Sequence, residues 1–205
     1  MTDNKYLSLL KKDYPTQEAV AAEIINLQAI LSMPKGTEHF VSDIHGEYEA
    51  FCHLLNTCSG VIREKVNLLY KDELSEKECA HIASLISYPK ETIELWEERK
   101  DVSDGKFEYY IEKLVHILLR VASKYTRSKV VKAVQPEFRY IINELINAKR
   151  EGFDYENFCK GVYKNIIGLK RAPAFIESLC ATIKRLAVAN LHIIGDIFDR
   201  GEHPD

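Results

Sequence analysis

Two short apolar runs stand near the ends of the 205-residue sequence, and acidic residues and glycine follow each at once. The first lies within His39–Glu47, HFVSDIHGE, and the second within Leu191–Gly201, LHIIGDIFDRG. Such runs predict two strands, and the run Leu191–Ile194 is expected to be buried. Open α/β sheets place ligands at the carboxyl ends of their strands. If the two strands are adjacent, their polar ends therefore meet at one ligand-binding edge.

The long region between these runs, residues 61–189, is rich in helical patterns and almost free of alternating strand patterns. Ser75 and Glu78 form a capping-box signature, and Pro89 suits the first turn of a helix. The apolar spacing and the breaks at glycine and proline predict a series of helices. We expect them over residues 75–87, 89–99, 106–125, 136–150, 154–167 and 173–186.

The N-terminal region is expected to consist of a surface arm, residues 1–15, and one helix from Gln17 to about Leu31 with Thr16 as its N-cap. Four apolar positions recur at helical spacing and predict one buried face. They are Val20, Ile24, Leu27 and Leu31. A further helix is expected from about Tyr48 to Thr57, directly after the first polar loop.

These elements predict an α/β chain dominated by helix, in which a right-handed crossover joins two parallel strands. We divide it into four segments. They are an arm and helix (1–36), a first strand–loop–helix (37–60), a helical insertion (61–189) and a second strand with its loop (190–205).

Charge and cysteine content narrow the class of protein. The formal charge of −3 is nearly balanced, and the basic residues form no stripe, which argues against a nucleic-acid partner. No apolar run is long enough to span a bilayer, and no signal peptide is recognisable. Five cysteines, an odd number without a Cys-x-x-Cys pair, predict reduced packing thiols in the cytoplasm.

Asp43 and His45 are the candidate ligands of the first loop. In an extended strand over Phe40–Ile44, residues two apart point to the same side. A carboxylate oxygen and an imidazole nitrogen on one side suit a divalent metal. Taken alone, the motif is equally well explained as a turn with a capping aspartate and a solvated histidine.

The second loop is more specific, because it holds two carboxylates, an arginine and two glycines within seven residues. Asp196 is placed to be a further metal-binding carboxylate, and Asp199 is close enough to orient a neighbouring ligand. Arg200 offers a planar fork of donors that matches phosphate oxygens. The alternative for Arg200 is a structural ion pair with Asp199. Adjacent strand ends would create a dinuclear site with metals roughly 3.5–4 Å apart.

SDIHG followed by GDIFDRG resembles the metallophosphoesterase superfamily, in its phosphoprotein-phosphatase-like branch. The large helical insertion between the motifs looks like class III fructose-1,6-bisphosphatase, a bacterial enzyme of gluconeogenesis. The resemblance implies that Asp43 and His45 bind a first metal and that Asp196 bridges two metals. It also implies that Asp199 supports a catalytic histidine and that Arg200 holds the substrate phosphate.

The same resemblance implies two divalent ions, Mn²⁺ or alternatively Mg²⁺, and hydrolysis of fructose 1,6-bisphosphate by a metal-activated hydroxide. The family's third motif, Gly-Asn-His followed by Glu or Asp, is absent from the sequence. We therefore interpret the chain as an N-terminal fragment that is inactive, or nearly so, by itself. The expected partner is a sugar bisphosphate, with no nucleic acid and no membrane, and homo-oligomerisation is left open.

Two rival functions remain at this point. The first is another phosphoesterase of the same branch, acting on a phosphoprotein or a dinucleoside polyphosphate, which the long helical insertion disfavours. The second is a regulatory or interaction module, in which the helical block sits on a non-catalytic scaffold.

Overall fold

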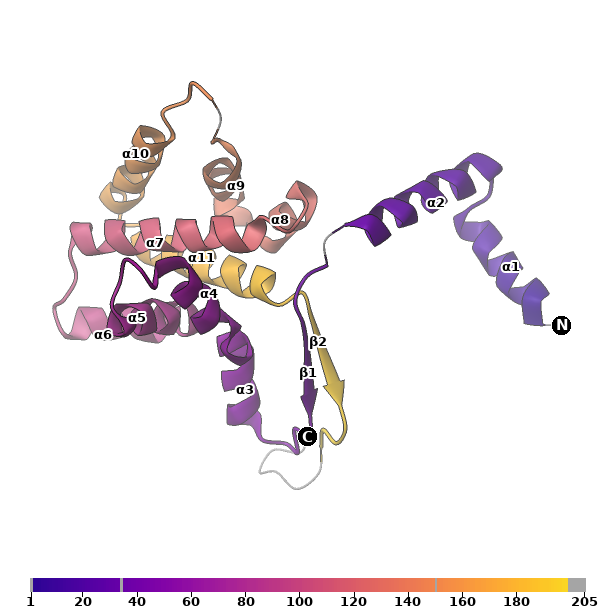
Figure 1. Cartoon of the computed structure of the whole chain (residues 1–205), viewed down its shortest axis with the longest axis horizontal. Helices are drawn as coiled ribbons and strands as arrows, with labels where there is room; N and C mark the ends of the chain where they lie inside the picture. Colours follow the sequence, from indigo (N-terminus) through magenta and orange to yellow (C-terminus); the bar gives the residue numbers. More distant parts are fainter. Residues whose placement is uncertain (1, 34, 150, 199–205) are drawn as a thin grey trace. The chain divides into compact units, whose positions relative to one another are not determined.

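The computed structural model describes residues 2–33, 35–149 and 151–198. It divides into two compact units, residues 1–35 and 36–205 (Figure 1). Helices dominate both units, and the sheet found among the described residues has two parallel strands. The predicted class, a helix-dominated α/β chain with two parallel strands, is therefore confirmed.

The first unit consists of α1 (Thr2–Asp13) and α2 (Gln17–Ser32). The predicted cap of α2 is confirmed, because the Thr16 hydroxyl accepts a hydrogen bond from the Ala19 amide at 3.2 Å. The predicted buried face of α2 is wrong, since none of its residues is buried. The region predicted as an arm forms α1, in which Tyr6, Leu7 and Leu9 are also exposed. The exposed apolar residues of this unit are Tyr6, Leu7, Leu9, Val20, Ile24, Ile25, Leu27, Ile30, Leu31 and Met33.

Most of the second unit is a helical body, which we define as residues 61–187. It consists of α4 (Val61–Tyr70), α5 (Glu76–Ser87), α6 (Pro89–Glu98), α7 (Asp104–Ala122), α8 (Arg127–Ala133), α9 (Arg139–Asn147), α10 (Tyr155–Gly168) and α11 (Ala172–Ala187). Six of these helices lie where the spacing of apolar residues and the breaks predict them. The exceptions are α4 and α8, which the pattern did not separate from their surroundings.

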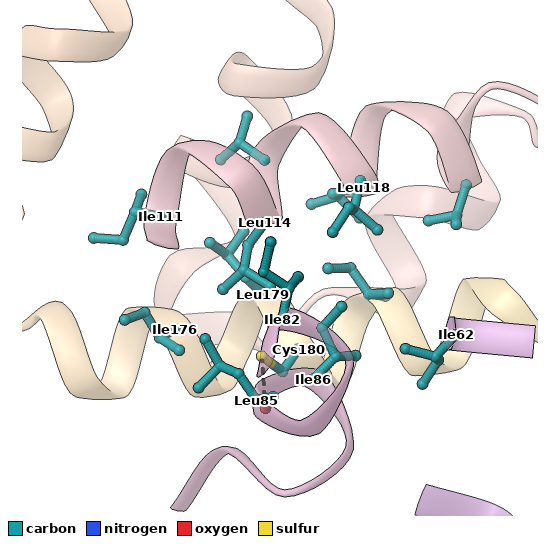
Figure 2. Close-up of a cluster of buried hydrophobic side chains, with 14 of the residues drawn as sticks. Ile62, Ile82, Leu85, Ile86, Ile111, Leu114, Leu118, Ile176, Leu179 and Cys180 are labelled. Atoms are coloured by element: carbon teal, nitrogen blue, oxygen red, sulfur yellow. Dashed lines mark hydrogen bonds between the residues drawn. The ribbon is translucent and has the colours of Figure 1, made fainter. Parts of the chain in front are cut away.

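The core of the body forms around α11, which packs against α5, α6 and α7. Figure 2 shows aliphatic side chains of α5 and α7 beside those of α11, and every labelled residue is buried. The one polar contact drawn there is from the Cys180 thiol to the Leu85 carbonyl oxygen, 3.6 Å apart. Large apolar residues at helical spacing on these helices thus form the core.

The predicted N-terminal signals of the body are also confirmed. Ser75 and Glu78 form a complete capping box at α5, in which each side chain bonds the backbone amide of the other residue. Pro89 occupies the first turn of α6. Ser103 caps α7, which begins two residues earlier than predicted.

The strand pair is formed by β1 (Glu38–Ser42) and β2 (Asn190–Ile194). The strands run parallel, in a register that extends from Glu38 opposite Asn190 to Ser42 opposite Ile194. They lie side by side in Figure 1 although the whole helical body separates them in sequence. Two parallel strands were predicted, and the structure shows that they are adjacent. The predicted burial of Leu191–Ile194 is wrong, since none of these residues is buried.

The start of the strand pair is fastened to the helical body. The Ala189 amide donates to the Thr37 carbonyl oxygen at 2.8 Å, and the Lys124 ammonium donates to the Thr37 hydroxyl at 2.8 Å. Gly36 is packed so closely that an added Cβ would lie 2.3 Å from the Ala189 Cβ. The body thus fixes where the strands begin and leaves their carboxyl ends to form the site.

Helices and cysteines are consistent with these packing roles. Among the described helices, none is both long and apolar enough to cross a membrane. All five cysteines are unpaired, and four of them are buried.

Candidate metal centre

The two polar loops meet because β1 and β2 end level with each other. Ser42 pairs with Ile194 as the last residues of the strands. Backbone hydrogen bonds continue beyond them. The Asp43 amide donates to the Ile194 carbonyl oxygen at 3.3 Å, and the His45 amide donates to the Asp196 carbonyl oxygen at 3.2 Å. Parallel strands in this register place the first residues of both loops at one sheet edge.

The conformation of the first loop differs from the predicted one. The strand ends at Ser42, and Asp43 and His45 adopt φ angles of 55° and 52°, in the left-handed region. Side chains therefore do not converge through strand alternation over Phe40–Ile44. Left-handed backbone is rare outside glycine, although aspartate and histidine are enriched there, and it is concentrated at functional sites.

Asp43, His45 and Asp196 nevertheless converge. Each offers one ligand atom, and these atoms lie within 4.8 Å of one another. Two ligand atoms on opposite sides of one ion, with bonds of about 2.0–2.2 Å, are separated by roughly 4.2 Å. Both carboxylates are exposed and can close this small difference by side-chain rotation. The three donors thus fit a divalent cation.

The charge of the cluster also suits a cation. Among the ion pairs formed within the described residues, none involves Asp43 or Asp196. Two carboxylates close together create a negative potential that attracts a divalent cation. Oxygen and imidazole donors are suited to hard or borderline ions such as Mg²⁺ and Mn²⁺.

Gly195 also belongs to the site, because it leaves room for the Asp43 carboxylate. The sequence motif alone did not predict this role. Gly195 has a φ of +98°, and a Cβ built on it would lie 2.6 Å from the Asp43 Oδ1 atom. Side chains larger than hydrogen would push the Asp43 carboxylate away from its position beside Asp196. The signal in the sequence is a glycine that directly precedes the second candidate ligand.

The first loop continues into α3 (Tyr48–Thr57), and the body holds this helix by side-chain bonds. The Lys184 ammonium donates to the Asn56 Oδ1 atom at 3.1 Å and to the Ser87 carbonyl oxygen at 3.2 Å. His53 and Tyr88 share a further hydrogen bond. The loop is therefore supported on one side by β1 and on the other by a fixed helix.

Cys58 lies at the end of α3 and is not a ligand of the cluster. Burial raises the pKa of its thiol to about 11, although the nearby Lys184 ammonium opposes that shift. Cys58 is buried in the hydrophobic core and therefore has a packing role.

Two predicted site residues, Asp199 and Arg200, lie outside the described residues. Asp43, His45 and Asp196 are thus the members of the predicted site whose positions the structure gives. Their convergence agrees with the prediction, and their predicted role as ligands rests on that geometry and on donor chemistry.

Comparison with known proteins gives one family. The profile described as Firmicute fructose-1,6-bisphosphatase matches residues 5–205. A Clostridium beijerinckii protein named fructose-1,6-bisphosphatase class 3 2 is 46% identical over 204 residues, which cover 99% of this chain and 31% of the relative. The class 3 protein of Listeria innocua is 44% identical over 203 residues, covering 99% and 31% respectively. That of Fusobacterium nucleatum is 44% identical over 204 residues, covering 99% and 32%.

The chain thus spans about a third of the length of these curated relatives. No solved structure gives a significant match.

Proposed function

The chain belongs to the Firmicute fructose-1,6-bisphosphatase family, and from that premise we propose that Asp43, His45 and Asp196 form part of a divalent-metal centre for hydrolysis of fructose 1,6-bisphosphate. The products would be fructose 6-phosphate and phosphate, as in gluconeogenesis. One observation carries the proposal: donor atoms from two motifs far apart in sequence lie within 4.8 Å of one another at the end of a parallel strand pair.

Each residue would have a defined task. Asp43 and His45 would hold a first ion, and Asp196 would be a ligand of both that ion and a second one. Mn²⁺ is the proposed ion, with Mg²⁺ as the alternative. When bound, such ions lower the pKa of a coordinated water and neutralise charge on phosphoryl oxygens.

The second loop would bind the substrate. Arg200 would hold the phosphate by two parallel N–H donors of its guanidinium group. Arginine commonly binds phosphate in this bidentate way. Asp199 would orient a histidine that acts on the leaving sugar oxygen. That histidine belongs to a Gly-Asn-His motif, which this sequence lacks. We therefore expect the 205-residue chain alone to show little or no turnover.

Metal binding is the first test, because it does not require activity. Titration calorimetry with Mn²⁺ on the 205-residue chain should give a binding isotherm that Asp43→Asn weakens by about tenfold or more. The matched control is Asp72→Asn, an exposed aspartate elsewhere, which should leave the isotherm unchanged. Equal binding by both variants would contradict the assignment of the ligands.

Activity is tested in a chimera. Residues 5–205 replace the matching region of the Clostridium beijerinckii relative, and phosphate release is measured with Mn²⁺. We expect turnover of fructose 1,6-bisphosphate, and a loss of about a hundredfold or more in kcat/KM for Asp196→Asn. A phosphoserine peptide and a dinucleoside polyphosphate serve as competing substrates. Preference for either one would overturn the proposed substrate.

A further inference from the structure

Three lysines, which we call the lysine cluster, gather where the helical body holds the start of β1. Lys124 follows α7 and donates to the Thr37 hydroxyl at 2.8 Å. Its ammonium lies 5.5 Å from the centre of the Tyr125 ring, and that of Lys129 on α8 lies 4.5 Å from the same centre. The separation of these two ammonium groups therefore cannot exceed the sum of the two distances, 10.0 Å. Lys65 on α4 is the third member, and its charge acts on Lys124.

The positive charge of the cluster is not neutralised by ion pairs within the described residues, because none of those pairs involves its three lysines. The stretch 113–136, which supplies two of them, contains no aspartate or glutamate. Glu38 at the start of β1 pairs with His192 at 3.6 Å instead. Partial burial lowers the pKa of Lys124, and the charges of the other two lysines lower it further. Such a concentration of one charge attracts an anion.

Two hydroxyl groups beside the cluster add hydrogen-bond donors. The Thr37 hydroxyl oxygen accepts from Lys124, so its own hydrogen remains for another acceptor. The Tyr125 hydroxyl is buried and has no hydrogen-bond partner among the described residues. It lies against Gly36, since a Cβ built there would be 2.6 Å from this oxygen. An unsatisfied buried hydroxyl is unfavourable, so the junction favours a ligand that brings acceptor oxygens.

We propose that Lys65, Lys124 and Lys129 bind the phosphate group of a small molecule, either free phosphate or a phosphate monoester. Ammonium and hydroxyl donors together suit an anion with several acceptor oxygens. Phosphate fits better than a single carboxylate, because its charge of nearly two can be shared among three lysines. A nucleic acid fits less well, because it needs a row of cations along its backbone, whereas two of these lysines share one tyrosine ring.

This phosphate site is separate from the candidate metal centre. Thr37 stands directly before β1 and Asp43 directly after it, so six residue steps of about 3.3 Å place them roughly 20 Å apart. A bound phosphate would join α4, the link between α7 and α8, and the start of β1. It would thus fasten to the body the strand that leads into the metal loop. The site uses none of the metal-ligand candidates, so it does not depend on the proposed function.

A titration with inorganic phosphate tests the site. The 205-residue chain is freed of metal by dialysis, and the ionic strength is held constant with chloride while backbone amide shifts are followed by NMR. The amides of Thr37 and Tyr125 should shift in a saturable way. A second titration with glycerol 3-phosphate distinguishes the two sources of the group. Tighter binding of glycerol 3-phosphate assigns the site to a phosphate monoester, and weaker or equal binding assigns it to free phosphate.

Matched substitutions then identify the lysines. Lys129→Gln removes an exposed ammonium, keeps the bond between Lys124 and Thr37, and should weaken phosphate binding about tenfold. Lys65→Gln should weaken it in the same direction, although Lys65 belongs to a different helix. The control is Lys160→Gln on α10, because exposed Lys160 lines a hollow together with two acidic residues and lacks this concentration of charge. Its phosphate affinity should equal that of the unchanged chain.

Three results would overturn the proposal. The first is unchanged phosphate affinity in both Lys129→Gln and Lys65→Gln, with circular dichroism showing that the variants are folded. The second is a set of amide shifts that do not saturate, or that chloride reproduces at equal ionic strength, since these would report general screening. The third is tighter binding of a double-stranded oligonucleotide that the same two substitutions weaken, which would assign the lysine cluster to nucleic acid.

Discussion

The helical body and the strand pair follow opposite designs. The body buries apolar residues from all of its helices in one cluster, and residues such as Phe175 and Leu179 have no exposed surface. The strand pair exposes Phe40 and Ile194 and places two non-glycine residues in left-handed backbone at its end. Burial of apolar side chains stabilises the body. The strand pair brings metal-ligand candidates together, but its loop backbone is strained and its apolar side chains stay exposed.

One chain thus contains a region that buries its own apolar residues and a region that leaves them exposed. The body positions the strand pair through the hydrogen bond from Lys124 to Thr37 but leaves Phe40 and Ile194 exposed. Stability of the chain should therefore depend on the body, while metal binding should depend on the strand ends. Four substitutions test how strictly these two properties are separated.

The largest expected effect is on stability, from Phe175→Ala. Phe175 on α11 is fully buried and contacts the Phe138 ring edge-on at 5.2 Å. Its truncation should lower the free energy of unfolding by about 3–5 kcal/mol. Phe40→Ala removes the same atoms from a side chain that is 65% exposed and should cost about 1 kcal/mol or less. Urea denaturation followed by circular dichroism measures both losses. Equal losses would contradict the claim that stability depends mainly on the helical body.

The second prediction concerns Gly195→Ala. Its Cβ would lie 2.6 Å from the Asp43 Oδ1 atom, so the carboxylate must move and Mn²⁺ affinity should fall about tenfold or more. Gly60→Ala is the control, because Gly60 also has positive φ but nothing lies within 4 Å of an added Cβ. That control should lose about 1 kcal/mol of stability through backbone strain and keep its Mn²⁺ affinity. Calorimetry that shows equal affinities for the two variants would remove Gly195 from the site.

Local signals explain why much of the fold was predictable. The capping box at Ser75, the cap at Thr16 and the proline at position 89 act within one helical turn. Apolar residues at helical spacing likewise predicted α7, while the packing of α7 against α11 was not predicted. The two strands themselves were predicted from the apolar run before each motif, while their adjacency was only assumed.

Other features depend on contacts that the sequence pattern does not contain. Asp43 and His45 have left-handed backbone, and their amides donate hydrogen bonds to the carbonyl oxygens of Ile194 and Asp196. These two partners are far from the first loop in sequence. The pattern therefore predicted the convergence of ligands but not the loop conformation that achieves it. Similarly, the spacing in α2 predicted an apolar face but could not identify what would cover it.

The third prediction concerns a cap within the body. Ser75→Ala removes the α5 cap and should cost about 1 kcal/mol at neutral pH. The Ser75 hydroxyl, and after it the Ser75 amide, donate to Glu78 and hold the pKa of that carboxyl below its ordinary value. A lowered pKa stabilises the fold above the ordinary carboxyl pKa, and this contribution disappears as pH falls through the folded-state value. The deficit of Ser75→Ala should therefore shrink in acid.

The control for that prediction is Thr126→Ala. Thr126 caps α8 by accepting from the Lys129 amide at 3.4 Å and has no carboxylate partner in its cap. Its deficit should not change over the same acidic range. A deficit of Ser75→Ala that is equally independent of pH, measured by urea denaturation at neutral and acidic pH, would contradict the coupling to Glu78.

The smallest expected effect is that of Leu31→Ala. It tests whether the apolar residues of α2 are buried, as in the body, or exposed, as in the strand pair. Leu31 is 73% exposed on a helix without buried residues, so its truncation should change the free energy of unfolding by about 0.5 kcal/mol or less. Leu114→Ala, at a fully buried position of α7, should cost about 2–5 kcal/mol in the same urea titration. A loss at Leu31 as large as that at Leu114 would show that this face is buried in solution. The apolar spacing of α2 would then be a better guide to burial than its exposed side chains, and α2 would resemble the body instead of the strand pair.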